Sequence, residues 1–222
     1  TLVVNFKTME FRQSPNFTPG KNEFKPIGFV IHGTAGAYEG AVDWLCTPPE
    51  KRVPVSYSSA HVVFAKDGRK IQLVKNSDIS WHAGIVSNPT PDFKKTIPLG
   101  ANPNSYYIGI ENEWFVGEGL TEQQYANIVE YIISTGIKFP EIRLHSEITD
   151  YKADFKTKDG KIDYSIVNEI KRRLALAMAP PLTIPKVDTN NTNTPTGNDQ
   201  SALIAQIKAK GSELLALINR LA

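Results

Sequence analysis

The apolar residues of this chain alternate in four short runs, each bounded by polar or turn-forming residues. The runs are IGFVIH (27–32), SAHVVFAKDGRKIQLV (59–74), YYIGIENEW (106–114) and EIRLH (141–145). Patterns of this length and spacing predict β-strands. Within the second run, Asp67 and Gly68 form a strong two-residue turn signal between apolar residues, which predicts an antiparallel hairpin.

Two further segments have the three-to-four-residue periodicity of helices. In residues 120–136, Thr121 and Gln124 have the spacing of a capping box, and Gly136 follows as a stop signal. The apolar face of this helix is predicted to contain Tyr125, Ile128, Val129, Ile132 and Ile133. The second helix, residues 163–178, is predicted to bury Ile166, Val167, Ile170 and Leu174.

The order of these elements predicts the fold class. A strand at 106–114, a helix and a strand at 141–145 form a crossover unit, which requires parallel strands. Because the hairpin at 59–74 must be antiparallel, the sheet is expected to be mixed. We therefore predict an α/β fold with a central mixed β-sheet flanked by helices.

The composition changes abruptly after Met178. Residues 179–200 contain four Pro, four Asn and five Thr without apolar periodicity, which is typical of an extended or disordered linker. Residues 201–222 then form an amphipathic helical pattern, and the predicted domains are 1–178, 179–200 and 201–222. The seam positions of that C-terminal helix follow steps of four and three, as in a coiled coil: Leu203, Ile207, Lys210, Leu214, Leu217 and Leu221. We expect self-association or docking through this face, with a frayed tail as the alternative.

Length and charge exclude several classes of protein. The chain has 222 residues, of which 41% are hydrophobic, so it can bury a substantial core. Its formal net charge of +2 is too small to indicate a nucleic-acid partner. No run approaches the roughly 18 apolar residues of a membrane span. Cys46 is the single cysteine, which excludes an internal disulfide framework.

Residues capable of chemistry stand at or near the ends of three predicted strands. His32 closes the first strand, Glu111 lies late in the third and His145 closes the fourth, while Lys152 and Asp154 follow two residues apart. Sites in open α/β sheets form at the carboxyl ends of strands. Two imidazoles and a carboxylate with one open position also form a catalytic zinc site, so His32, His145 and Asp154 are candidate ligands. The alternative is that each is an ordinary hydrogen-bonded structural residue.

Five motifs occur in an order that closely resembles the zinc-dependent N-acetylmuramoyl-L-alanine amidases, a family that includes peptidoglycan recognition proteins and phage lysozyme-type amidases. They are FVIHGTAG, SSAHVVFAKDGRKIQLV, ISWHAG, YYIGIENE and RLHSEITDYKAD, and they lie within residues 25–155. The resemblance implies a mixed sheet flanked by helices. It also implies cell-wall degradation, as by an endolysin, through cleavage of the amide between N-acetylmuramic acid and L-alanine of the stem peptide.

The resemblance also assigns roles to particular residues. It places zinc on His32, His145 and Asp154, although this donor set would accept other divalent ions. It implies that Glu111 is the general base and that Lys152 stabilises the oxyanion.

Two other motifs carry candidate residues. Some family members have a Tyr before the His of the second motif, whereas this chain has Ala60 before His61, so Glu111 is the better candidate base. His61, between apolar neighbours, is expected to be a packed structural residue. The resemblance places Trp81 and His82 at the rim of the substrate groove, where we expect contact with substrate.

Two other functions remain open at this point. A module that binds muropeptides without cutting them is the main alternative, although such relatives characteristically lack a metal ligand. A glycosidase using Glu111 and Glu113 is weaker, because carboxylates two residues apart on one strand cannot easily flank a sugar. The sequence is compatible with a phage lysin, a periplasmic enzyme or a secreted enzyme.

Overall fold

The computed structural model describes residues 9–179, 205 and 208–212. The chain divides between Ile170 and Lys171 into two compact units, and the larger one, Phe6–Ile170, contains both β-sheets and all the candidate site residues.

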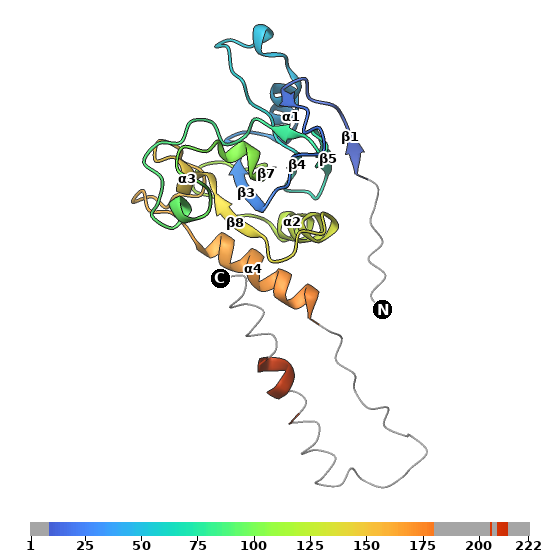
Figure 1. The fold of residues 1–222 in the computed structure, drawn as a ribbon, viewed down its shortest axis with the longest axis vertical. Coiled ribbons are helices and arrows are strands. Elements are labelled where there is room, and N and C mark those ends of the chain that lie inside the picture. The colour runs from blue at the N-terminus through green and yellow to red at the C-terminus, as the bar shows by residue number, and fades with distance from the viewer. Residues whose placement is uncertain (1–8, 180–204, 206–207, 213–222) are drawn as a thin grey trace. The chain divides into compact units, whose positions relative to one another are not determined.

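A six-stranded mixed sheet forms the centre of this unit (Figure 1), as the sequence predicted. Its order is β1-β5-β4-β7-β3-β8. Neighbouring strands from β4 through β7 and β3 to β8 are parallel, whereas β4 and β5 form the predicted antiparallel hairpin. The strands are β1 (Glu10–Phe11), β5 (Lys70–Gln72), β4 (Val62–Phe64), β7 (Tyr107–Asn112), β3 (Gly28–Gly33) and β8 (Glu141–Leu144).

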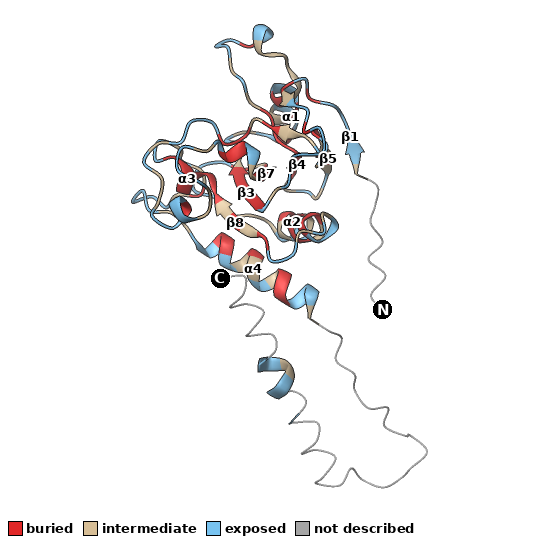
Figure 2. Ribbon diagram, viewed as in Figure 1, coloured by how far each residue is buried: buried red, intermediate tan, exposed pale blue. Residues whose placement is uncertain are grey.

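Helices pack against both faces of the sheet, and the buried residues in Figure 2 lie mainly between these layers. On one face, α1 (Tyr38–Cys46) packs against β4 and β5 through a cluster that includes Val42 and Val63. On the other face, α2 (Glu122–Ser134) places the Tyr131 ring against Phe29 and Phe64. Alternate side chains of the central strands β3, β4 and β7 are therefore buried on opposite faces of the sheet.

Helix α2 confirms the predicted capping box but not the whole predicted face. Thr121 accepts from the backbone of Gln124, and the Gln124 side chain accepts from the backbone of Thr121. Ile133, predicted to face the core, is 39% exposed, whereas Tyr131 is 4% exposed. The buried arc is rotated because the Tyr131 ring fills the space between the aromatic rings of β3 and β4.

The segment between β6 and β7 packs on the same face of the sheet as α1. A two-stranded sheet of β2 (Phe17–Thr18) and β6 (Ile79–Ser80) leads into it. Val30 of β3 and Tyr107 of β7 then pack with residues that follow β6 and β8. This buried cluster consists of Val30, Ala83, Phe93, Tyr107 and Ile148. The remaining helices of the unit are η1 (Pro49–Lys51), η2 (Phe93–Lys95), η3 (Pro103–Ser105) and α3 (His145–Ile148).

Helix α4 (Ser165–Met178) follows, and its four predicted apolar positions are buried: Ile166, Val167, Ile170 and Leu174. Beyond it, residues 205 and 208–212 are helical. The predicted linker and all seam positions of the C-terminal helix except Lys210 lie outside the described residues. The domain boundaries and self-association therefore stay predictions. Among the described helices, none is long and apolar enough to cross a membrane.

Candidate active site

Three neighbouring parallel strands bring the predicted site residues to one edge of the sheet. His32 is the fifth residue of β3 and is paired in register with Glu111 of β7. His145 was predicted to close a strand; it is instead the first residue of α3, directly after β8. Because β7 and β8 both pair in parallel with β3, their carboxyl ends meet at His32. The predicted meeting of these side chains at one edge is confirmed.

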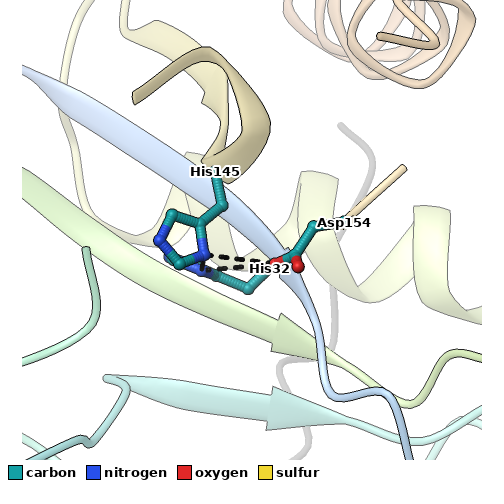
Figure 3. Close-up of side chains that lie close together, drawn as sticks. All are labelled: His32, His145 and Asp154. Carbon is teal, nitrogen blue, oxygen red and sulfur yellow. Dashed lines mark hydrogen bonds and ion pairs between the residues drawn. The ribbon is translucent and has the colours of Figure 1, made fainter. Parts of the chain in front are cut away.

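His32, His145 and Asp154 form a compact cluster (Figure 3). The two Nδ1 atoms of the histidines are 2.9 Å apart, and Oδ2 of Asp154 lies 3.2 Å from Nδ1 of His145 and 3.9 Å from Nδ1 of His32. Two ligand atoms of a tetrahedral zinc ion are separated by about 3.3 Å, given metal–nitrogen and metal–oxygen bonds near 2.0 Å. The three donor atoms therefore have the spacing of a metal site.

The far nitrogens of both rings establish which nitrogen carries the proton. Nε2 of His145 lies 3.1 Å from the carbonyl oxygen of Ala83, so it must donate. Nε2 of His82 lies 3.0 Å from the carbonyl oxygen of Tyr107, so Nδ1 of His82 accepts. That atom lies 3.0 Å from Nε2 of His32, which must then donate as well. In the neutral rings, both Nδ1 atoms therefore bear bare lone pairs.

Two bare lone pairs 2.9 Å apart cannot form a hydrogen bond with each other. Burial, followed by the neighbouring charges of His145 and His82, lowers the pKa of His32 well below its usual value, which disfavours a proton between the rings. A metal cation would satisfy both lone pairs and the adjacent carboxylate together. The residues present therefore fit a divalent ion such as zinc.

Aromatic packing next to β3 surrounds the candidate carboxylate ligand, Asp154. Phe155, with a positive φ of 54°, buries its ring 5.2 Å from that of Trp114. A Cβ at Gly33 would lie 2.6 Å from the Trp114 ring, so glycine allows this close packing. The backbone N–H of Gly33 donates to Oδ2 of Asp154 at 3.4 Å. Neither Trp114 nor Phe155 was predicted from the sequence, because a buried aromatic residue beside a candidate ligand is a weak signal in sequence alone.

A cleft of about 620 Å³ opens over the cluster. Its lining includes Glu111, His145, Lys152 and Asp154. Glu111 is partly exposed, yet its Oε2 is shielded from solvent and has no hydrogen-bond partner among the described residues. Burial, reinforced by Asp154 and opposed by Lys152, raises the pKa of Glu111 to about 8. A carboxyl group that can exchange a proton near neutral pH therefore stands beside the cluster.

The sequence profile of the N-acetylmuramoyl-L-alanine amidase family matches residues 22–159, which is more than half of the chain. This chain belongs to that family. Membership supports a peptidoglycan amidase activity. It also places the five motifs, the cluster and the cleft within one matched region.

Two solved structures are similar to this amidase. It is similar to a selenomethionine derivative of AmpD, with a TM-score of 0.51 and 21% identity over 73% of this chain and 93% of that one. It is also similar to the endolysin amidase LysCS of Clostridium intestinale URNW, with a TM-score of 0.49 and 17% identity over 75% of this chain and 95% of that one. Among curated protein sequences, none matches significantly.

The remaining predicted residues of the amidase have distinct surroundings. His61 is a packed structural residue, as expected, with its ring fully buried and stacked on Phe24. His82 is 6% exposed, lines the cleft and uses both ring nitrogens in contacts with His32 and Tyr107. Trp81 donates from its indole to Thr18 and is not among the described residues that line the cleft. Contact of Trp81 or His82 with substrate stays a prediction.

Proposed function

We propose that this amidase hydrolyses the amide between N-acetylmuramic acid and L-alanine of the stem peptide, with zinc held by His32, His145 and Asp154. The observation that carries the proposal is the convergence of two imidazole lone pairs and a carboxylate oxygen beside a cleft that His145 and Asp154 line. When bound, zinc supplies Lewis-acid chemistry, since it acidifies the attacking water and polarises the scissile carbonyl.

Glu111 is proposed as the general base and then the general acid. It lines the same cleft, and the shielded Oε2 is free of hydrogen bonds to the described residues. Burial raises the pKa of Glu111 to about 8 in the metal-free protein, and the positive charge of a bound zinc ion would lower it, which favours the carboxylate that takes a proton from water and returns it to the leaving amine.

Lys152 is proposed to stabilise the negative charge that develops on the scissile carbonyl oxygen. It lines the cleft two residues before Asp154, and its charge acts on both His32 and Glu111. A fixed cation in a partly dry cleft contributes more than it would in water. Lys152 also opposes the burial penalty of an ionised Glu111, which keeps the pKa of that carboxyl from rising further.

A non-catalytic muropeptide-binding module is the second candidate function. It requires the same cleft but no metal, and the convergent donor atoms of the cluster argue against it. The glycosidase reading is further weakened because Glu113 does not share the cleft lining with Glu111. Its Oε2 instead accepts from the backbone N–H of Lys66 at 2.9 Å.

Digestion of purified cell walls separates these functions. An amidase releases new amino groups, a glycosidase releases new reducing ends, and a binding module releases neither. The proposal expects new amino groups, one bound zinc ion per chain and loss of activity on chelation that added zinc restores. New reducing ends, or full turnover after complete removal of the metal, would contradict it.

A further inference from the structure

Two consecutive residues contact the far nitrogens of both histidine ligands. Nδ1 of His82 lies 3.0 Å from Nε2 of His32, and the carbonyl oxygen of Ala83 lies 3.1 Å from Nε2 of His145. The two ligands are 113 residues apart in sequence and come from different elements. One short segment, residues 82–83, thus contacts both of them from behind.

The segment is itself held rigidly. Oδ1 of Asn104 accepts from the backbone N–H groups of His82 and Ala83, at 3.1 Å and 2.8 Å. Nε2 of His82 donates to the carbonyl oxygen of Tyr107 at 3.0 Å. Gly109 leaves room for the imidazole, because a Cβ there would lie 2.4 Å from the His82 ring. His82, Ala83 and Asn104 are all buried, so these bonds are made away from solvent.

We propose that His82 and Ala83 are positioning residues that hold both histidine ligands in the tautomer required for metal binding, and that Asn104 keeps the pair in place. This rests on the proposed function only in taking His32 and His145 as ligands. An imidazole ligand must present a bare nitrogen to the metal, and a hydrogen bond at its other nitrogen selects that tautomer and fixes the orientation of the ring. Here Nδ1 of His82 accepts the hydrogen bond from His32, and the Ala83 carbonyl accepts the one from His145.

The first test uses the metal-free full-length protein and needs no activity. At pH 8, nitrogen-15 NMR of the histidine rings should show the proton on Nε2 of His32, His82 and His145. The replacement His82→Leu removes the acceptor behind His32 and keeps side-chain bulk. It should leave His32 as a mixture of tautomers while His145 stays unchanged. A single Nε2–H tautomer of His32 in that variant would overturn the proposal.

The second test measures the zinc dissociation constant by competition with a chelator. His82→Leu should weaken binding by about 10- to 100-fold, the usual effect of losing a partner of a ligand. His82→Gln offers an amide oxygen toward His32 and an amide N–H toward Tyr107, so it should restore most of the affinity. Asn104→Ala should weaken zinc binding less than His82→Leu, because it loosens the segment without removing an acceptor.

His61→Leu is the matched control, since it removes an equally buried imidazole whose hydrogen bonds go to Ser80, Gly109 and Asp78 and not to a ligand. It should lower stability and weaken zinc binding far less than His82→Leu does, because its ring only packs edge-on against that of His82, with the ring centroids 6.2 Å apart. Tight zinc binding by the wild type with equal affinity in His82→Leu would refute the positioning role alone. A wild-type chain that binds no zinc would refute the metal site and this inference together, whatever the cell-wall assay shows.

Discussion

The buried His61 differs from the buried pair His32 and His145 in how the ring nitrogens are paired. Nδ1 of His61 accepts from Ser80 Oγ at 2.7 Å and from the backbone N–H of Gly109 at 3.0 Å. Its Nε2 donates to the carbonyl oxygen of Asp78 at 3.0 Å. Both ring nitrogens are therefore satisfied by the protein itself. Burial lowers the pKa of His61 to about 4, which keeps the ring neutral.

The cluster of His32, His145 and Asp154 is equally buried in its imidazoles but is not self-sufficient. The far nitrogen of each ring is paired, whereas the near nitrogens face each other and a carboxylate. The difference teaches that burial alone does not distinguish a structural histidine from a metal ligand. Lone pairs that converge without a proton between them do, since they leave a place only a cation can fill.

Removing the carboxylate of Asp154 from the cluster should have the largest effect on zinc binding and turnover. Asp154→Ala deletes one of the three proposed ligand atoms, so we expect no retained zinc and no detectable turnover. His145→Ala should behave in the same way. Metal analysis of the purified protein and digestion of cell walls measure both outcomes. Asp150→Ala is the control and should retain zinc and activity, because this exposed carboxylate accepts hydrogen bonds from Ser87 and Asn88 and is not part of the cleft lining. If Asp154→Ala still bound one zinc ion per chain, Asp154 would not be a metal ligand.

Removing the proposed base should separate metal binding from catalysis. Glu111→Gln should retain bound zinc and lower kcat by about a hundred- to ten-thousandfold, the range for a general acid or base. Glu113→Gln is the matched control two residues along the chain, and it should leave turnover unchanged because its carboxylate bonds to the Lys66 backbone. Normal turnover of Glu111→Gln with zinc in place would mean that another group transfers the proton.

Removing the proposed oxyanion partner should have a smaller effect on turnover. Lys152→Ala is expected to bind zinc almost normally and to lose about a hundred- to a thousandfold in kcat. The control is Lys156→Ala, because the Lys156 ammonium donates to the carbonyl of Asp150 and is not part of the cleft lining. If both lysine variants turn over equally, Lys152 is only a surface charge.

Replacing His61, whose ring nitrogens are both paired within the protein, should mainly lower stability. His61→Leu leaves the Ser80 hydroxyl, the Gly109 N–H and the Asp78 carbonyl without their present partner, so we expect a loss of about 1–3 kcal/mol in the free energy of unfolding. Urea denaturation measures this loss. If folded His61→Leu lost as much zinc as Asp154→Ala does, the expected difference between His61 and the cluster would be wrong.

The smallest expected effect is a pH dependence of the metal-free protein. The pKa of Glu111 is raised to about 8, so between its unfolded value and pH 8 the native state binds the proton more tightly than the unfolded state does. The stability that this provides is complete below the unfolded pKa and is lost as pH rises through about 8. Denaturation of the chelated protein from pH 6 to 9 should therefore show falling stability. Glu111→Gln should flatten that fall, and equal slopes for both proteins would contradict the shift.

Much of the local structure was predictable because its signals lie within a few residues. The Thr121 capping box, the turn at Asp67 and Gly68, and the strand periodicities each depend on neighbouring positions. The buried face of α2 was less predictable. Tyr131 is buried in place of Ile133 because its ring packs against Phe29 and Phe64, which lie on two strands distant in sequence. The candidate ligands were found from their places after strands and from ordered motifs, which also need no tertiary contact.

The sequence by itself therefore determined which chemical groups are available at the carboxyl edge of the sheet, since parallel strands place their final residues together. Only the tertiary structure decided what each imidazole does. The Tyr107 and Ala83 carbonyls select the protonated nitrogens of His82 and His145, and His82 then selects that of His32. The tautomer of a histidine depends on a hydrogen-bond acceptor within about 3 Å of one particular ring nitrogen. Such a contact between residues distant in sequence cannot be predicted from their spacing along the chain.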